Sequence, residues 1–295
     1  LQSIINDHKA YQEAGYRLPA FDCEKVRAYT QKNPTWIHFG AGNIFRAFQA
    51  NVLQNLLNSG ASNTGVIAVE GFDYEIIEKI YRSHDNLSIL ATLKADGSIE
   101  KTVVGSITEA LLLDRHNPEE YGRLKEIFTS PSLQMASFTI TEKGYATTDS
   151  AGNILPAIAA DFNAGPEGCE SYLGKVVSLL YARYQNGQLP IAMVSMDNCS
   201  HNGDKLFAAV RAFAQAWADK GLADEAFLSY ISDKSKVSFP WTMIDKITPG
   251  PDASVASMLE KDGLPAGTPF VNAEESEYLV IEDAFPNGRP PLEKA

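Results

Sequence analysis

Cysteine is scarce in this chain of 295 residues, which contains only Cys23, Cys169 and Cys199. Their spacings match neither a disulfide framework nor a tetrahedral zinc site. We therefore expect reduced thiols, no bound metal and a cytoplasmic location.

Basic residues are also fewer than acidic ones. The chain has 25 Lys and Arg against 37 Asp and Glu, a formal net charge of −12, and no basic run interrupts the acidic background. Phosphate polyanions would be repelled over most of the surface, which disfavours nucleic acid or an anionic membrane as a partner. An anionic ligand would need a local device such as a helix N-terminus.

Long apolar runs are absent as well. No window reaches the roughly 18 apolar residues of a membrane span, and residues 1–9 lack a basic segment followed by an apolar one. We expect a protein that is neither exported nor membrane-spanning. The apolar fraction of 44% is still enough for a sizeable core.

Alternating strand and helix patterns follow an N-terminal arm over residues 1–34, and they predict one α/β domain over residues 35–295. The expected fold is a Rossmann-like, largely parallel sheet with helices on both faces. Strands are predicted over 36–39, 66–69, 135–141 and 191–195, and helices over 44–57, 74–82, 118–128, 170–184 and 204–220.

Two segments depart from this alternation. Asp96-Gly97 lies between apolar runs at 87–93 and 99–104, a strong hairpin signal. From about residue 230 to 295, short apolar runs over 237–247 and 270–285 predict added strands and loops. We therefore expect an antiparallel extension of the parallel sheet.

The most informative motif is the Gly40-Ala41-Gly42 turn, which follows the first strand and precedes a helix. Two glycines permit a sharp turn and close approach of a ligand, and the helix offers unpaired N–H groups to a pyrophosphate. Glu70, at the end of the next strand, is placed to accept hydrogen bonds from an adenosine ribose. Arg46 opposes the helix dipole unless a phosphate lies between the two. A tight turn without a ligand is the alternative, because Phe45 stands where the usual fingerprint has a small residue.

A polar cluster follows the strand at 191–195, where ligands bind in open α/β sheets. Asn198 could donate a hydrogen bond to a developing alkoxide. The alternative is that Asp197, Asn198 and Asn202 form Asx turns that cap the next helix. Cys199 with His201 would also permit a thiol nucleophile, although no third orienting group is evident.

Two further clusters contain isolated acids. Glu142 and Lys143 follow the strand at 135–141 and are either ligand-binding or a solvated ion pair. Asp245 stands in an apolar stretch, where a buried carboxylate must find a partner or shift its pKa. A role beside a substrate and a role as a cap are both open for Asp245.

Taken in order, five motifs resemble those of the mannitol dehydrogenase family, the polyol-specific long-chain dehydrogenases that include mannitol 2-dehydrogenase, fructuronate reductase and tagaturonate reductase. The resemblance covers residues 37 to 291. The motifs are the glycine loop at 38–50, Thr-Ile-Thr-Glu-Lys-Gly-Tyr at 139–145, Met-Asp-Asn with Asn-Gly at 196–203, Phe-Pro through Asp-Lys-Ile-Thr-Pro at 239–249, and the segment 280–290.

The resemblance implies hydride transfer between the nicotinamide of NAD and a secondary alcohol carbon of a sugar alcohol or sugar acid. It implies that Asn198 forms part of an oxyanion hole and that Asp245 positions substrate hydroxyls. Glu70 suits NAD, because its carboxylate would repel a 2′-phosphate. The positions implied to bind the cofactor are Phe39, Gly40, Ala41, Gly42, Asn43, Ile44, Phe45, Arg46, Glu70, Glu142 and Asp197.

One family motif has no match. The general base of the family is a lysine in Lys-x-x-x-x-Asn-x-x-His on a C-terminal helical domain, and these 295 residues contain no such pattern. We therefore expect the catalytic helical domain to be absent from this chain. A non-catalytic module that senses or presents NAD is one alternative, and a small-molecule methyltransferase that binds S-adenosylmethionine is another.

Overall fold

The computed structural model describes residues 1, 4 and 7–295, so residues 2, 3, 5 and 6 of the predicted N-terminal arm lie outside the described part. Its largest sheet has six strands, all parallel, in the order β6-β3-β2-β7-β8-β9. The strands are β2 (Trp36–Phe39), β3 (Val66–Glu70), β6 (Ile107–Leu112), β7 (Met135–Phe138), β8 (Ile191–Ser195) and β9 (Val237–Ser238). This is the doubly wound dinucleotide-binding order: β2, β3 and β6 extend the sheet in one direction, and β7, β8 and β9 extend it in the other, so the strand order reverses between β2 and β7. The predicted fold class is confirmed.

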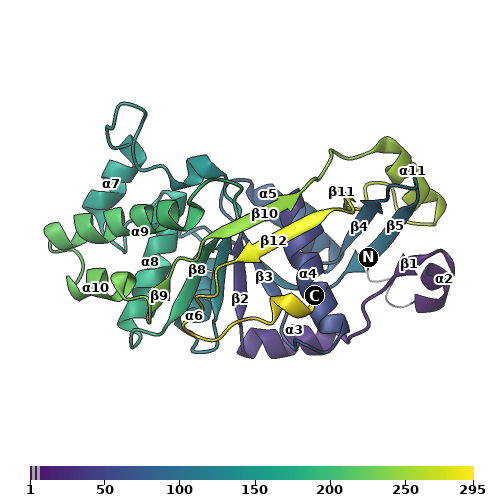
Figure 1. The fold of residues 1–295 in the computed structure, drawn as a ribbon, viewed down its shortest axis with the longest axis horizontal. Helices are drawn as coiled ribbons and strands as arrows, with labels where there is room; N and C mark the ends of the chain where they lie inside the picture. Colours follow the sequence, from purple (N-terminus) through teal and green to yellow (C-terminus); the bar gives the residue numbers. More distant parts are fainter. Residues whose placement is uncertain (2–3, 5–6) are drawn as a thin grey trace.

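Helices cover both faces of this sheet because side chains alternate along each strand. Ile37 and Phe39 of β2 face one core, and Trp36 faces the other. The first core is covered by α6 (Pro118–Thr129), α8 (Tyr172–Gln185), α9 (Asn202–Asp219) and α10 (Ala226–Ser232). The second core is covered by a π-helical turn (Phe45–Gln49), α4 (Ala50–Asn58) and α3 (Cys23–Lys32). Figure 1 shows α8, α9 and α10 together at one end of the molecule.

A second sheet stands beside the first, in the order β1-β5-β4-β11. Its strands are β1 (Tyr16–Arg17), β4 (Ser88–Leu93), β5 (Ile99–Val104) and β11 (Phe270–Glu274). The β4–β5 pair is the predicted hairpin, with Gly97 at φ +84° in its turn. The helix α11 (Ala253–Lys261) packs Val255 and Leu259 into the core of this sheet.

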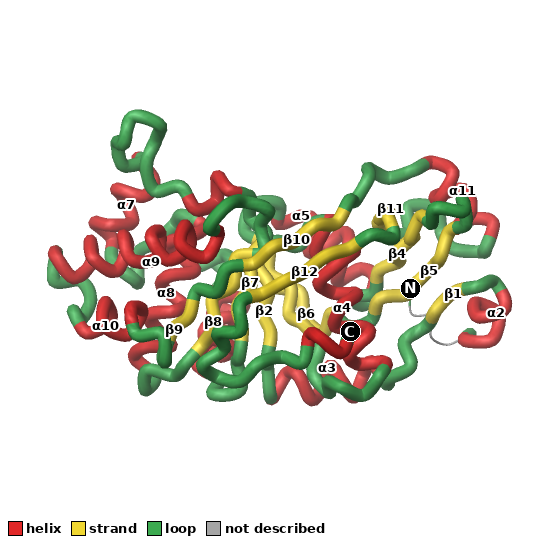
Figure 2. The backbone as a smooth tube through the Cα atoms, viewed as in Figure 1, coloured by secondary structure: helices red, strands yellow, loops and turns green. Residues whose placement is uncertain are grey.

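A third, two-stranded antiparallel sheet is formed by β10 (Thr242–Lys246) and β12 (Glu277–Ile281). We call it the β10–β12 ribbon. It crosses the front of the molecule in Figures 1 and 2. Ile244 of β10 is buried in the second core, and Leu279 and Ile281 of β12 pack against that core. The predicted antiparallel additions are therefore confirmed.

The remaining elements are short. They are α2 (His8–Glu13), α5 (Tyr74–Ile76), a second π-helical turn (Ile77–Tyr81), α7 (Pro156–Ala164), and 3-10 turns at Arg82–His84, Glu142–Tyr145 and Leu292–Lys294. Within the described residues, none of the helices has the length and apolar character needed to span a membrane.

The structure corrects several predicted elements. The strand predicted over 135–141 ends at Phe138, because the N–H groups of Ile140 and Thr141 are bound by a side chain from the neighbouring strand end, described below. The helices α3, α7 and α11 and the strand β6 were not predicted. The helix α7 has a weak amphipathic pattern, because Ile158 and Asp161 are its only buried residues.

Arg183 ties the amino-terminal side of the parallel sheet together. Its guanidinium is fully buried and donates hydrogen bonds to the carbonyls of Phe128, Ser130, Leu133, Leu189 and Pro190, at 2.5 to 3.1 Å. Burial lowers the pKa of Arg183 to about 10. The cation thus supplies hydrogen bonds to backbone carbonyls in the loops that lead into β7 and β8.

Arg183→Met should lower the free energy of unfolding by about 3 kcal/mol or more, since a hydrogen bond to a charged group is worth about 1.5 to 3 kcal/mol. Urea unfolding followed by circular dichroism measures the loss. Arg211→Ala is the control, because Arg211 is exposed on α9. Equal unfolding midpoints for the two variants would contradict the prediction.

Candidate cofactor and substrate site

The glycine turn at the carboxyl end of β2 requires glycine at position 40. Gly40 has φ +113°, and a Cβ there would lie 2.2 Å from the carbonyl oxygen of Thr139. Its N–H donates to the carbonyl of Val69 at 2.9 Å. A Cβ on Gly42, by contrast, would meet no atom within 4 Å. Gly40 is needed by the fold, whereas Gly42 leaves open space beside the turn.

Glu70 fastens the glycine turn to the end of β3. Its Oε2 accepts the Ala41 N–H at 3.1 Å, and its Oε1 accepts the N–H groups of Gly71 and Phe72, both at 2.8 Å. The side chain is 8% exposed. The carboxylate thus lies at the turn, as the sequence predicted, but its oxygens already serve three backbone donors.

Arg46 is buried beside the same turn without an anionic partner. It is 4% exposed and donates to Asn43 Oδ1 at 2.7 Å and to Ser88 Oγ at 3.4 Å, while its Nε has no hydrogen-bond partner. No ion pair to Arg46 is found among the described residues. Burial lowers its pKa, because the charged form loses hydration. A buried cation with an unused donor next to a glycine turn is suited to a phosphate.

Other cofactor positions predicted from the sequence are part of the scaffold of the turn. Phe39 and Phe45 are fully buried, and the Phe45 ring stacks on His38 at 4.5 Å. The Ala41 carbonyl accepts the Tyr81 hydroxyl at 2.7 Å. Ile44, ahead of the π-helical turn, has helical dihedrals and no side-chain cap. These residues support the backbone of the glycine turn.

Asp197 connects the ends of β7 and β8. Its Oδ2 accepts the Ile140 N–H at 3.0 Å and the Tyr145 hydroxyl, and its Oδ1 accepts the Thr141 N–H at 2.9 Å. Burial raises the pKa of Asp197, and these hydrogen bonds oppose the shift. The carboxylate is therefore engaged in holding the loop after β7.

Thr141 is held in a strained conformation by that clamp. Its φ is +65° and its ψ 160°, a combination that costs a β-branched residue about 1 to 3 kcal/mol. Strain of this kind gathers at binding sites, where the surrounding structure enforces it. Glu142, next in the chain, forms an ion pair with Lys205 of α9, so the solvated pair with Lys143 considered above is not formed.

Asn198 lies in the loop after β8, exposed and with no hydrogen bond to its amide among the described contacts. The loop is anchored by Asn202, which is 1% exposed. The Asn202 amide donates to the Asp197 carbonyl at 3.1 Å and to Thr242 Oγ1 at 2.7 Å, and its Oδ1 accepts the Thr242 N–H at 3.0 Å. Asn202 thus joins the β8 loop to the start of β10.

The helix-cap alternative holds only in part, and the thiol alternative is not supported. The N-cap of α9 is His201, which makes no side-chain cap hydrogen bond, and Asp197 binds the loop after β7 instead of the helix. Asn202 Oδ1 accepts one N–H of the first helical turn, that of Gly203, at 2.9 Å. Burial raises the pKa of Cys199, which disfavours the thiolate. His201 instead contacts the Trp241 ring at 4.5 Å, so the geometry does not support a thiol nucleophile.

Asp245 is exposed on β10, so the expectation of a buried carboxylate is wrong. The strand directs Ile244 inward and the residues on either side of it outward. Asp245 follows Thr242 by three residues, roughly 10 Å along the strand. Its carboxylate is free to meet a ligand from the outer side of the ribbon.

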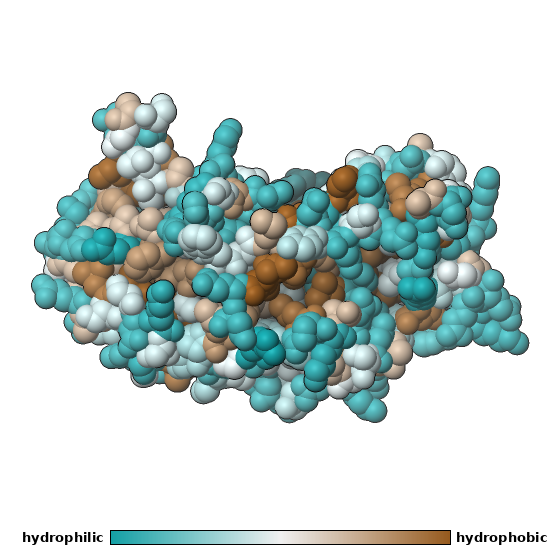
Figure 3. Space-filling model, in the orientation of Figure 1, coloured by the Kyte–Doolittle hydropathy of each residue, from teal (hydrophilic) through white to brown (hydrophobic). Residues whose placement is uncertain are grey.

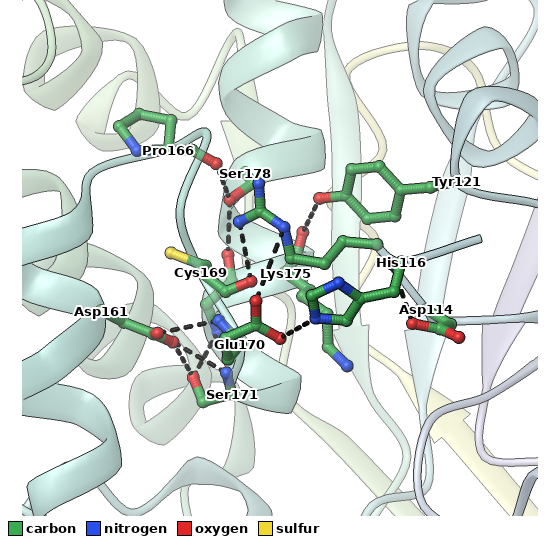
Figure 4. A network of polar contacts seen from close by, with 12 residues as sticks. Asp114, His116, Tyr121, Asp161, Pro166, Cys169, Glu170, Ser171, Lys175 and Ser178 are labelled. Atoms are coloured by element: carbon green, nitrogen blue, oxygen red, sulfur yellow. Dashed lines mark hydrogen bonds and ion pairs between the residues drawn. The ribbon is translucent and has the colours of Figure 1, made fainter. Parts of the chain in front are cut away.

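A polar network fixes α8 beside the Glu70 loop (Figure 4). The buried Asp161 carboxylate accepts the N–H groups of Glu170 and Ser171 at 2.8 and 2.9 Å. His116 Nε2 lies 3.0 Å from Glu170. Tyr172, the residue after Ser171, stacks on the exposed Phe72 ring at 4.7 Å. The network therefore positions the Tyr172 ring against the loop that follows Glu70.

The residues that position these loops were not predicted from the sequence. His38 lies within 2.6 Å of Ser137 Oγ and 2.9 Å of Thr139 Oγ1, and thereby links β2 to β7 below the glycine turn. Thr242 and Tyr81 were not singled out either. A polar residue within an apolar strand, as at His38, was the available signal. In the described part of the chain, no group of His, Cys, Asp or Glu side chains is arranged to hold a metal ion.

Comparison with known proteins places these features in context. The mannitol dehydrogenase Rossmann domain matches residues 34–294. The chain is 48% identical to D-mannonate oxidoreductase of Thermotoga maritima, covering 100% of this chain and 56% of that protein. It is 30% identical to Polyol:NADP oxidoreductase of Gluconobacter oxydans, over 96% of this chain and 55% of that protein.

A solved structure is similar as well. The Pseudomonas fluorescens mannitol 2-dehydrogenase ternary complex with NAD and D-mannitol aligns with a TM-score of 0.77 and 29% identity, over 95% of this chain and 54% of that one. The chain therefore spans about half the length of the relatives it matches.

Because His38 is buried beneath the turn, protein stability should depend on its protonation. Burial lowers the pKa of His38 to about 3, whereas an unfolded histidine titrates near 6.5. As the pH falls below 6.5, the unfolded chain binds this proton and the folded chain does not. His38 should therefore lower stability by up to about 1.4 kcal/mol per pH unit down to pH 3.

Urea unfolding at pH 7, 6, 5 and 4 tests this for the wild type and His38→Gln. The variant should be less stable at pH 7 but should lose less stability on acidification. Parallel pH profiles would show that His38 is protonated in the folded state.

Proposed function

Because this chain belongs to the mannitol dehydrogenase family, we propose that it is the cofactor half of an NAD-dependent oxidoreductase. The substrate class is a sugar alcohol or sugar acid, of the mannitol–fructose or mannonate–fructuronate type. Bound nicotinamide would supply or accept the hydride at a secondary alcohol carbon. The rest of the enzyme corresponds to the part of the relatives that this chain does not span.

The buried Arg46 carries this proposal. A cation with no carboxylate partner and an unused Nε, beside a glycine turn with open space at Gly42, fits a pyrophosphate. Arg46 and Asn43 would bind the anion, and Gly40 would keep the turn close to β7. The switch point of the sheet between β2 and β7 is where doubly wound folds bind dinucleotides.

Glu70 favours NAD over NADP. Its carboxylate is held at the end of β3 by three backbone donors, and it retains lone pairs for ribose hydroxyls. A 2′-phosphate in the same place would be repelled, since burial strengthens the interaction between like charges.

The exposed amide of Asn198 is suited to hold the reacting oxygen of the substrate, because its donor makes no hydrogen bond to any of the described residues. The outward carboxylate of Asp245 would bind a substrate hydroxyl. The lysine motif that the family resemblance implies as the general base has no match in residues 1–295, so the group that moves the proton is expected in the other half of the enzyme. We infer that the chain ending at Ala295 does not turn over substrate by itself.

Arg46→Met should weaken NADH binding by about tenfold or more, since a charge-assisted hydrogen bond contributes about 1.5 to 3 kcal/mol. Quenching of NADH fluorescence measures the dissociation constant, on the full gene product and on residues 1–295. Lys79→Met is the matched control, because Lys79 is exposed. An unchanged dissociation constant in a folded Arg46→Met protein would show that Arg46 does not contribute to NADH binding. Saturable binding of S-adenosylmethionine without NADH would reject the proposed function.

Glu70→Gln should narrow the preference for NADH over NADPH, because it removes the charge that repels a 2′-phosphate. The ratio of the two dissociation constants is the measurement. A wild-type protein that already binds NADPH more tightly than NADH would contradict the assignment of NAD.

Asn198→Ala in the full gene product should reduce kcat by about 100-fold to 1,000-fold, the usual effect of removing one oxyanion donor. Reduction of fructose, fructuronate and tagaturonate with NADH is the assay. Ser200→Ala, in the same exposed loop, should leave kcat within about twofold. Equal rates for the two variants would exclude Asn198 from the reaction.

A further inference from the structure

A row of hydrogen-bonding side chains lies inside the molecule, between β2 and β7. Hydrophilic residues cover most of the face drawn in Figure 3, but these side chains are in the interior. Trp36, His38 and Ser137 are each 2% exposed or less, and His38 is directly opposite Ser137 in the register of the two strands. Buried polar side chains that are fully hydrogen-bonded make their surroundings rigid. The row can therefore hold the ends of β2 and β7 in one arrangement.

The contacts of this row run from Trp36 to the glycine turn. The Trp36 Nε1–H donates to Ser137 Oγ at 2.7 Å, and Ser137 Oγ lies 2.6 Å from His38 Nδ1. The other ring nitrogen, His38 Nε2, lies 2.9 Å from Thr139 Oγ1. Thr139 Oγ1 in turn lies 3.4 Å from the Gly40 carbonyl oxygen. We call Trp36, Ser137, His38 and Thr139 the relay.

Donor chemistry gives the relay a single direction. An indole N–H can only donate, so Ser137 accepts from Trp36. Among the described contacts, the partner left for the Ser137 hydroxyl hydrogen is His38 Nδ1. Nδ1 therefore accepts, and the proton of the neutral ring lies on Nε2. Nε2–H then donates to Thr139 Oγ1, and the Thr139 hydroxyl donates to the Gly40 carbonyl.

The opposite direction would leave a buried donor unsatisfied. A proton on Nδ1 would give Ser137 Oγ two incoming hydrogen bonds and would leave its own hydrogen without an acceptor in a fully buried site. It would also turn the Thr139 hydroxyl toward Nε2 and away from Gly40. A doubly protonated ring is disfavoured as well, because burial lowers the pKa of His38 to about 3. The neutral form with Nε2–H satisfies every member of the relay.

The relay contacts both parts of the candidate cofactor site. Thr139 lies directly over Gly40, since a Cβ at position 40 would be 2.7 Å from Thr139 Oγ1. The His38 ring stacks on Phe45 at 4.5 Å with an interplanar angle of 8°. Phe45 begins the π-helical turn that includes Arg46. The orientation of one imidazole ring thus links the glycine turn to the buried cation assigned above to the pyrophosphate.

We propose that the relay positions the glycine turn: by holding His38 as the neutral Nε2–H tautomer, it fixes the Gly40 carbonyl in the orientation that receives the cofactor. His38 and Thr139 are positioning residues, which act through Gly40 and not by contact with the nucleotide. The effect on cofactor binding rests on the proposed function, whereas the direction of the relay does not.

Nitrogen-15 NMR of the full gene product, labelled in histidine, reads the tautomer directly, and His38→Gln identifies the peaks of His38. At pH 7, Nδ1 should resonate as an unprotonated nitrogen and Nε2 as a protonated one. In Thr139→Val the Nε2 proton loses its acceptor, so its proton resonance should move upfield, and in Thr139→Ser it should stay. A proton on Nδ1, or on both nitrogens, would overturn the proposal.

The NADH dissociation constants of the same proteins measure the effect on the site. Thr139→Val should weaken binding about threefold to tenfold, the change to which one neutral hydrogen bond corresponds. Thr139→Ser keeps the hydroxyl and should stay within about twofold of the wild type. Thr148→Val is the matched control, because Thr148 is exposed in the chain that follows β7.

Two binding results would also overturn the proposal. Equal dissociation constants for the wild type and Thr139→Val would show that the relay does not set the turn. Equal weakening by Thr139→Val and Thr139→Ser would trace the loss to packing and not to the hydroxyl. A wild type that does not bind NADH would reject the proposed function, and the tautomer and the Nε2 proton resonance would still decide the direction of the relay.

Discussion

The close approach of β2 and β7 at Gly40 is the constraint on which the site depends. The Thr139 carbonyl occupies the space that a Cβ on Gly40 would need, so the two strand ends can meet only if position 40 has no side chain. Once they meet, Gly40 bonds to the end of β3, and Glu70 and Tyr81 hold Ala41 from either side. The glycine turn is thus fixed before any ligand arrives.

The two charges nearest that turn differ in how well they are satisfied. Glu70 accepts three backbone N–H groups, so the protein itself stabilises its charge. Arg46 is equally buried, but its partners among the described residues are the neutral side chains of Asn43 and Ser88. Burial without a counter-ion leaves a positive field in the turn. An anion that binds there recovers part of the desolvation cost of Arg46.

Features set by adjacent residues were predictable. The β4–β5 hairpin follows from Asp96-Gly97, and the strands β2, β3 and β8 follow from apolar runs bounded by turns. The outward position of Asp245 could not be predicted, because it depends on which face of β10 meets the core. A helix cap was the open alternative for Asn202 from its place in the chain, but no local pattern indicated that its amide also binds Thr242, 40 residues away. The Asp197 contacts to residues 140 and 141 likewise join segments more than 50 residues apart.

The sequence by itself determined the doubly wound sheet, the glycine turn with its following helix, and the resemblance to a dehydrogenase family, because strand periodicity, turn residues and ordered motifs are local properties of the chain. Only the tertiary structure decided that Asp197 and Asn202 support loops, that Arg46 is a buried cation without an anionic partner among the described residues, and that His38 is buried beneath the glycine turn. Burial and pairing arise when distant segments pack together, and no local pattern specifies which side chains are left unmatched.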